Sequence, residues 1–319
     1  MLGFLSAAVP FVIAVAAVVA AVVIAAYICY AIAFRVNKRK LGDPHEMLPG
    51  EQYAAQKHRI LPLVEAALKI PYEDVWITSA DGLRLHAAYY EVAPGAPLEI
   101  QIHGYKSIAI RDFSGGLPLA MGLSHNVLLI DQRAHGKSEG RCLTFGILER
   151  EDCLSWVNYA CDRFGKDVKI LLVGVSMGAA TVLMATGLPL PENVVGIVAD
   201  SGYTSPKEII CKDIRARGLL PAVFYPLLRM GAQLYGRFDL ERCDAPTALE
   251  NCTVPVLFFH GEDDRFVPCE MSVRNHAACA AAKTLCTVAD AGHGLELLID
   301  EETYKAQLEA FYATVLVEK

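Results

Sequence analysis

The sequence has no excess of positive charge and little of the polar bias that keeps a chain unfolded. Its 319 residues carry 29 lysine and arginine side chains against 36 aspartate and glutamate side chains, for a net charge of −7. A nucleic-acid binder needs a basic face to replace the counterions on the phosphates, so this balance argues against nucleic acid as a partner. Hydrophobic residues make up 54% of the chain, which excludes a disordered or collagen-like protein.

The cysteines lack the patterns of a disulfide scaffold or a metal site. Ten occur in the chain, without a Cys-x-x-Cys pair and without a Cys/His cluster at zinc spacing. Cys29 lies in an apolar segment and leaves nine in the remainder, an odd number. We therefore expect reduced structural thiols in a reducing compartment, and neither a metal ion nor an organic cofactor.

Charged side chains are missing altogether from residues 1–34. The 24 residues of Phe11–Phe34 would form a helix of about 36 Å, enough to cross roughly 30 Å of hydrocarbon. A cleaved signal peptide has a basic start and a shorter apolar core, and no lysine or arginine occurs before position 35. We therefore predict that residues 1–40 are an uncleaved transmembrane anchor with a basic stop.

The basic residues that follow this apolar segment predict its orientation. Arg35, Lys38, Arg39 and Lys40 come directly after it, and nothing basic precedes it. Because cytoplasmic flanks carry the excess of positive charge, we expect the N-terminus outside and residues 35–319 in the cytoplasm. The protein would then be a single-pass protein of the cell membrane.

Strand-like and helical patterns alternate through most of the remaining chain. Residues 41–72 contain four prolines and read as a connector with a short amphipathic stretch at Leu61–Ile70. Asp81-Gly82 suits a tight hairpin turn between the first two strands. The later, almost wholly apolar strands predict an α/β fold with a mostly parallel sheet covered on both faces. The expected strands are Val75–Thr78, Leu83–Val92, Leu98–Ile102, Asn126–Ile130, Val168–Val173, Val194–Val198, Val256–Phe259 and Thr284–Val288.

One serine lies at a predicted turn from strand to helix. Val168–Val173 leads into Gly174-Val175-Ser176-Met177-Gly178, and Ala179–Thr186 has a helical pattern. Such a sharp turn requires unusual backbone angles, and the residues two positions from the serine must be small so that the chain can cross itself. The helix N-terminus favours a negative charge that develops beside the hydroxyl. We therefore predict Ser176 to be a nucleophile.

A serine nucleophile requires a base, and the base requires an acid that orients it. For this arrangement the chain order is serine, acid, histidine. His293 is the only histidine after position 276, and its loop follows the last expected strand, so we predict it to be the base. The acid stays open among the carboxylates that follow two other strands at the edge where parallel sheets bind ligands: Glu262, Asp263, Asp264 and, less favoured, Asp200.

Two backbone N–H groups are expected to stabilise the oxyanion. One belongs to Met177, the residue after the nucleophile, and the other to Tyr105, after the strand Leu98–Ile102. A polar loop later in the chain contains Arg133 and His135. We favour a bracing role for that loop over direct contact with substrate.

These motifs, in this order, resemble the α/β-hydrolase superfamily and, more closely, bacterial membrane-anchored serine hydrolases of the alpha/beta-hydrolase-domain-containing group. Two departures from the usual pattern, Ala134 and Val175, lie outside the predicted triad. The matching runs are Ile77–Leu85, His103-Gly104-Tyr105, Asp131–Ser138, Gly174–Thr181, Gly261–Pro268 and Gly292-His293-Gly294.

The resemblance implies both the acid and the reaction. In that family G-x-x-D-x-x-V-P follows the strand that carries the acid, and here it falls on Gly261, Asp264, Val267 and Pro268. Asp264 would therefore complete the triad. The resemblance also implies an α/β-hydrolase fold with an eight-stranded sheet and a small helical lid. The reaction that it implies is the hydrolysis of carboxylic esters through an acyl-enzyme.

The insert at about 202–250 is expected to be the lid of a catalytic domain at 73–319. Its apolar stretch Leu219–Leu228 suggests a lipophilic acyl substrate such as a monoacylglycerol or a lysolipid, or else packs the lid onto the core. A serine peptidase and a non-catalytic membrane-tethered scaffold are the alternative functions. The sequence leaves the natural substrate and the oligomeric state open.

Overall fold

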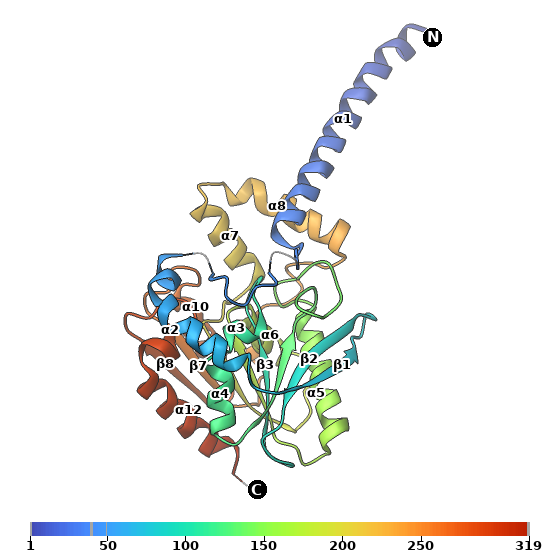
Figure 1. The fold of residues 1–319 in the computed structure, drawn as a ribbon. Coiled ribbons are helices and arrows are strands. Elements are labelled where there is room, and N and C mark those ends of the chain that lie inside the picture. Colours follow the sequence, from blue (N-terminus) through green and yellow to red (C-terminus); the bar gives the residue numbers. More distant parts are fainter. Residues whose placement is uncertain (1, 39–40, 49, 318–319) are drawn as a thin grey trace.

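A computed structural model describes residues 2–38, 41–48 and 50–317, with side chains described from Pro10 onward. Its centre is an eight-stranded sheet in the order β1-β2-β4-β3-β5-β6-β7-β8 (Figure 1). β2 runs antiparallel to both of its neighbours, and the other neighbouring strands are parallel. The predicted mostly parallel sheet is therefore confirmed. The strands are β1 (Glu73–Thr78), β2 (Arg84–Tyr90), β3 (Leu98–Ile102), β4 (Asn126–Asp131), β5 (Ile170–Val175), β6 (Val194–Asp200), β7 (Val256–Gly261) and β8 (Lys283–Val288).

Helices cover both faces of the sheet because successive strand residues point to opposite sides. In β5, Ile170 and Leu172 belong to one core, whereas Leu171 and Val173 belong to the other. The first core lies under α5 (Glu149–Phe164), α6 (Met177–Ala185) and α10 (Cys269–Ala278). The second lies under α3 (Ala109–Asp112), α4 (Gly116–Gly122), α11 (Glu296–Ile299) and α12 (Glu301–Val315).

The 202–250 insert between β6 and β7 is helical. It contains α7 (Pro206–Ala216), α8 (Pro221–Gly231), a π-helical turn η1 (Ala232–Gly236) and α9 (Ala245–Leu249). In Figure 1, α7 and α8 lie beyond the carboxyl ends of the parallel strands, with α8 beside the base of α1.

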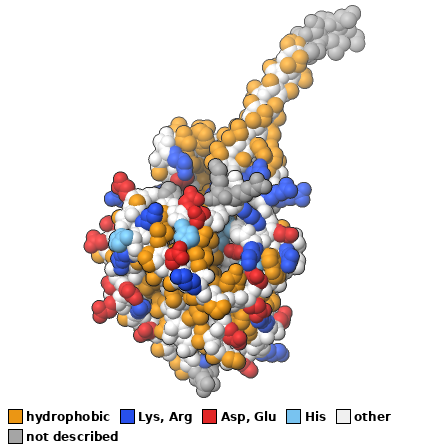
Figure 2. Space-filling model, viewed as in Figure 1, with side chains coloured by type: hydrophobic (Ala, Val, Ile, Leu, Met, Phe, Trp, Pro, Cys, Tyr) orange, Lys and Arg blue, Asp and Glu red, His pale blue; other side chains and the backbone are white. Residues whose placement is uncertain are grey.

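The apolar N-terminal segment forms one long helix, α1 (Leu2–Ala33). Its part Pro10–Ala33 has 24 residues and a mean hydropathy of 2.9, long and apolar enough to cross a membrane. A signal sequence near an N-terminus has the same character. Figure 2 shows hydrophobic side chains along the described part of α1, which stands out from a body whose surface mixes both charges.

The last third of α1 packs against the insert. A Cβ atom on Gly231 of α8 would lie only 2.4 Å from the carbonyl oxygen of Ala26, so the two helices touch through their backbones. Phe34, just after α1, is fully buried, and its ring lies 5.7 Å from that of Phe145 and 5.3 Å from that of Phe238. The end of the predicted anchor is therefore part of the folded domain.

The chain after α1 also follows the folded domain closely. Arg35 forms a single β-bridge to the loop after β4, and Lys38 donates a hydrogen bond to the carbonyl of Ser138. Two other residues of the predicted basic stop, Arg39 and Lys40, lie outside the described residues. The helix of the connector, α2 (Glu51–Ala67), begins ten residues before the predicted stretch Leu61–Ile70. Pro62, one of the four prolines of the connector, lies inside α2.

Candidate active site

Ser176 occupies the tight turn between β5 and α6. Its φ of 56° and ψ of −115° lie in a region that residues with side chains seldom adopt. A Cβ on Gly174 would lie 2.3 Å from the carbonyl oxygen of Gly178, and a Cβ on Gly178 would lie 1.8 Å from that of Ile102. Neither position has room for a side chain, which confirms that the residues two positions from Ser176 must be small.

Two hydrogen bonds join Ser176, His293 and Asp264, three residues far apart in the sequence. His293 Nε2 lies 2.8 Å from Ser176 Oγ, and His293 Nδ1 lies 2.6 Å from Asp264 Oδ2. Asp264 follows β7 and His293 follows β8, so the parallel strands bring both loops to the edge where β5 ends. An imidazole that donates from Nδ1 to the carboxylate has Nε2 free to accept the serine proton.

The Asp264 side chain is fully buried and held by several donors. Its Oδ1 accepts hydrogen bonds from the backbone N–H groups of Phe266 and Val267 at 2.8 and 2.9 Å. Burial alone would raise the pKa of Asp264, but the charge of His293 and the hydrogen bonds from His260 and His293 hold it well below its usual range. The carboxylate is therefore ionised at neutral pH.

The other carboxylates considered as the acid lie elsewhere. Glu262 and Asp263 are exposed, and Glu262 accepts a hydrogen bond from the Thr287 hydroxyl at 2.8 Å. Asp200 is buried and accepts a hydrogen bond from the hydroxyl of Tyr304 at 3.2 Å. Among the four candidates, the hydrogen bond to His293 is made by Asp264.

A second histidine, which the sequence analysis did not single out, lies behind Asp264. His260, the penultimate residue of β7, is fully buried, and its Nε2 lies 2.9 Å from the carbonyl oxygen of Val267 and 3.2 Å from Asp264 Oδ2. Its Nδ1 lies 2.6 Å from Ser272 Oγ. With a proton on Nε2, the imidazole can donate to the oxygens of both Val267 and Asp264, because a carbonyl and a carboxylate oxygen accept hydrogen bonds. The sequence signal was its place four residues before Asp264.

A buried pair of carboxyl groups lies below the His293 loop. Ser201 Oγ and the Gly261 N–H each donate to Glu296 Oε1 at 2.6 Å. Glu296 and Asp200 are both buried, and burial together with their mutual repulsion raises the pKa of Glu296. The pair links α11, which follows His293, to the ends of β6 and β7.

The loop after β3 lies against the nucleophile. A Cβ on Gly104 would lie 3.3 Å from Ser176 Cβ, and the Gly104 N–H donates to Asp112 Oδ2 at 2.8 Å. The next N–H along, that of Tyr105, makes no hydrogen bond with the described residues. Met177 is the first residue of α6, where a helix leaves its N–H groups without internal acceptors. Both predicted oxyanion donors therefore lie in the two segments that meet at Ser176.

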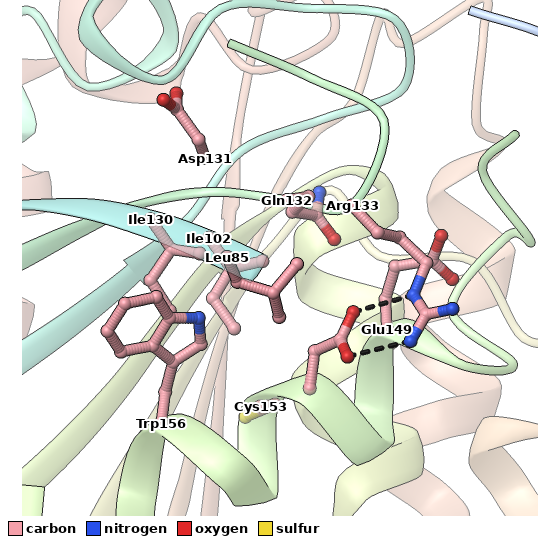
Figure 3. A pocket seen from close by; sticks show the side chains of 10 residues that line it. Leu85, Ile102, Ile130, Asp131, Gln132, Arg133, Glu149, Cys153 and Trp156 are labelled. Carbon is pink, nitrogen blue, oxygen red and sulfur yellow. Dashed lines mark hydrogen bonds and ion pairs between the residues drawn. The ribbon is translucent and has the colours of Figure 1, made fainter. Parts of the chain in front are cut away.

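The polar loop after β4 is closed by ion pairs. Arg133 turns its guanidinium toward α5 (Figure 3), where Nε and Nη2 donate to Asp152 at 2.6 and 2.7 Å. Nη1 donates to Asp81 at 3.0 Å. The cavity beside it measures about 10 Å³, room for no more than one water molecule. His135 is buried, and burial lowers its pKa to about 3. These contacts agree with a bracing role for the loop.

The described residues offer little to a metal ion. No group of three or more histidine, cysteine, aspartate or glutamate side chains within them could hold one.

A doubly covered parallel sheet, with a serine at a strand-to-helix turn and with acid and histidine loops at the same edge, defines an α/β hydrolase.

Comparison with known proteins agrees with this class. The model of the alpha/beta hydrolase family matches residues 102–306, more than half of the chain. The chain therefore belongs to the alpha/beta hydrolase family.

Relatives and solved structures resemble most of the chain. The uncharacterized protein YqkD of Bacillus subtilis is 26% identical over 227 residues, which cover 70% of this chain and 73% of YqkD. The alpha/beta hydrolase domain-containing protein WAV2 of Arabidopsis thaliana is 24% identical over 270 residues, 80% of each chain. The structure of the Pyrococcus furiosus esterase Pf2001 superposes with a TM-score of 0.62 and 23% identity, covering 79% of this chain and 94% of the esterase. At that identity, the superposition shows a shared fold.

Proposed function

We propose that this hydrolase cleaves carboxylic ester bonds, with Ser176 as nucleophile, His293 as base and Asp264 as the acid that orients the base. The observation that carries the proposal is the pair of hydrogen bonds, 2.8 Å and 2.6 Å long, that runs from the serine through the histidine to the carboxylate. The fold shared with Pf2001, which is described as an esterase, supports the reaction class.

The reaction would follow from that geometry in two halves. Ser176 Oγ attacks the acyl carbonyl carbon while its proton passes to His293 Nε2, and the N–H groups of Met177 and Tyr105 hold the oxyanion. The alcohol leaves with the proton from His293, and an acyl-enzyme remains on Ser176. A water molecule then gives a proton to His293 and attacks the acyl carbon. His293 returns that proton to Ser176 Oγ as the bond from the acyl carbon to Oγ breaks, which releases the carboxylic acid and restores the serine.

We further propose that α1 anchors the enzyme in the cell membrane, with the folded domain on the cytoplasmic side, and that the acyl group is lipophilic. Supporting this, Leu220, just before α8, and Val223, in its first turn, are 68% and 52% exposed, and α8 contacts α1. Tyr225 and Leu228 of the same helix are buried. The apolar stretch of the insert is thus divided between packing inward and facing outward near the proposed membrane.

A fluorophosphonate probe and a series of p-nitrophenyl esters test the proposal on the full-length protein in detergent. We expect wild type to be labelled, and Ser176→Ala to lose labelling and about 10⁶-fold in kcat. Activity rising from acetate to medium-chain esters would support a lipophilic acyl group, and a preference for acetate or butyrate would refute it. Equal labelling of the alanine variant would refute the nucleophile.

The alternative functions give different results in the same experiment. A non-catalytic scaffold would show no labelling of the folded wild-type protein. A serine peptidase would be labelled, but it would cleave peptide p-nitroanilides faster than the matching esters.

A further inference from the structure

The helix α2, in the segment between the apolar helix and the sheet, contacts the main chain of His293. The Tyr53 hydroxyl donates a hydrogen bond of 2.9 Å to the His293 carbonyl oxygen. On the neighbouring residue, Gln52 Oε1 lies 3.4 Å from the His293 N–H. Tyr53 is 6% exposed, so its hydrogen bond is shielded from water. The backbone carbonyl and the backbone N–H of His293 are therefore both contacted by side chains of α2.

The same helix explains the glycine that precedes His293. A Cβ on Gly292 would lie 2.1 Å from Gln52 Oε1 and 2.9 Å from Gln52 Cδ. Gly292 has no positive φ, so a left-handed backbone does not require glycine there. A side chain at position 292 would instead displace the Gln52 amide from the His293 N–H.

Aromatic rings connect α2 to the imidazole as well. The Tyr53 ring stacks on that of Phe266 at 6.2 Å, and the Phe266 ring lies 5.8 Å from the His293 ring. Phe266 also donates its backbone N–H to Asp264. Phe266 therefore connects α2 and the histidine to the loop of the acid.

The segment before α2 is fastened to the domain independently of these contacts. The Arg111 guanidinium donates to the carbonyl of Glu46, and its Nη2 donates to Ser107 Oγ at 2.9 Å. At the other end of the helix, Val64 and Ala67 are buried. With both ends fixed, α2 can hold the His293 loop in one place.

We propose that α2 is part of the active site, and that Tyr53 and Gln52 are positioning residues that hold the main chain of His293 so that Nε2 stays within reach of Ser176. This inference rests on the proposed function. It assigns the connector a role in catalysis besides linking the apolar helix to the sheet. A catalytic domain beginning at residue 73 would lack this support.

The first test removes one hydroxyl group. Tyr53→Phe is expected to lower kcat for a p-nitrophenyl ester and the fluorophosphonate labelling rate by about tenfold, with KM unchanged, because a loosened loop misplaces the base. Amide hydrogen exchange in residues 290–296 should become faster. The matched control is Tyr312→Phe, which removes another buried hydroxyl with a 2.9 Å hydrogen bond, to Glu99. Equal kcat in the two variants would overturn the proposal.

The second test uses a coupled pair and does not depend on the folding of the first variant. Gly292→Ala should displace the Gln52 amide from the His293 N–H and lower kcat. The double variant with Gln52→Ala should have the kcat of Gln52→Ala alone, because both substitutions remove the same contact. Losses that add in the double variant would show that the two substitutions do not act through one contact between α2 and the loop.

The two proposals fail in different ways. If wild type reacts with neither esters nor the probe, the proposed function fails, and hydrogen exchange still reports whether Tyr53 restrains the loop. If wild type reacts and Ser176→Ala does not, but neither Tyr53→Phe nor the paired variants change kcat, the positioning role alone is refuted.

Discussion

Two buried charged clusters lie at the same edge of the sheet, and they differ in whether one basic atom is left to face a nucleophile. Around Arg133 all three guanidinium nitrogens donate to Asp152 or Asp81, so the cluster is closed. Around Asp264 the carboxylate is equally well bound, but His293 Nε2 faces the partly exposed hydroxyl of Ser176. A buried charged cluster whose guanidinium nitrogens all have charged partners thus stabilises its loop. A cluster in which one basic atom faces a nucleophile is a candidate catalytic site.

The comparison implies that loss of charge at Asp264 acts on the rate. In Asp264→Asn the imidazolium loses its counter-charge, and the amide can hold the wrong histidine tautomer, so we expect kcat to fall by about 10⁴-fold. Ester hydrolysis and fluorophosphonate labelling of the full-length protein measure the loss.

Asp263→Asn is the matched control, because Asp263 is exposed in the same loop. It should leave kcat within about twofold of wild type, as expected for an exposed side chain that touches neither His293 nor Ser176. A loss below tenfold in Asp264→Asn would contradict the assignment of the acid.

Loss of charge at Asp152 should act on stability instead. Asp152→Asn leaves the Arg133 guanidinium, whose side chain is 5% exposed, with the half-exposed Asp81 as its remaining ion-pair partner among the described residues. Breaking a buried ion pair costs about 3–5 kcal/mol, and we expect the free energy of unfolding to fall by an amount of that order. Urea denaturation followed by tryptophan fluorescence measures it, with activity per labelled serine unchanged.

Asp213→Asn breaks an exposed pair with Arg217 and serves as the control. Its effect should stay below about 0.5 kcal/mol, since exposed ion pairs contribute little. If Asp152→Asn kept its stability and lost activity per labelled serine, the loop of Arg133 would belong to the substrate site.

The sequence could predict those parts of the site that depend on local geometry. The glycines around Ser176 reflect contacts within one turn, so the nucleophile could be predicted from its neighbours. The carboxyl ends of parallel strands fall at one edge of the sheet, so both partner loops could be predicted as well. Asp263 and Asp264 follow the same strand, and no pattern of residues alone separates them. Only the family pattern favoured Asp264.

Other features depend on contacts between distant segments and left no periodic signal. α1 is apolar on every side, so nothing in its pattern marks which face packs against α8 or that Phe34 is buried in the domain. The contact from Tyr53 to His293 spans 240 positions. His260 has the sequence context of an ordinary strand end, and that context alone does not indicate its contact with Asp264.

The smallest expected effect is the pH dependence of the Asp264 contacts. Because the folded-state pKa of Asp264 lies below that of the unfolded chain, its charged contacts stabilise the fold above about pH 4, and this contribution disappears as the pH falls through the folded value. A single proton limits the slope to about 1.4 kcal/mol per pH unit. We therefore expect the difference in unfolding free energy between wild type and Asp264→Asn to decline below pH 4. Urea denaturation at each pH measures this difference, in which the other carboxylates cancel because both proteins contain them. A difference that stays unchanged between pH 4 and pH 3 would mean that the Asp264 contacts do not favour the ionised carboxylate.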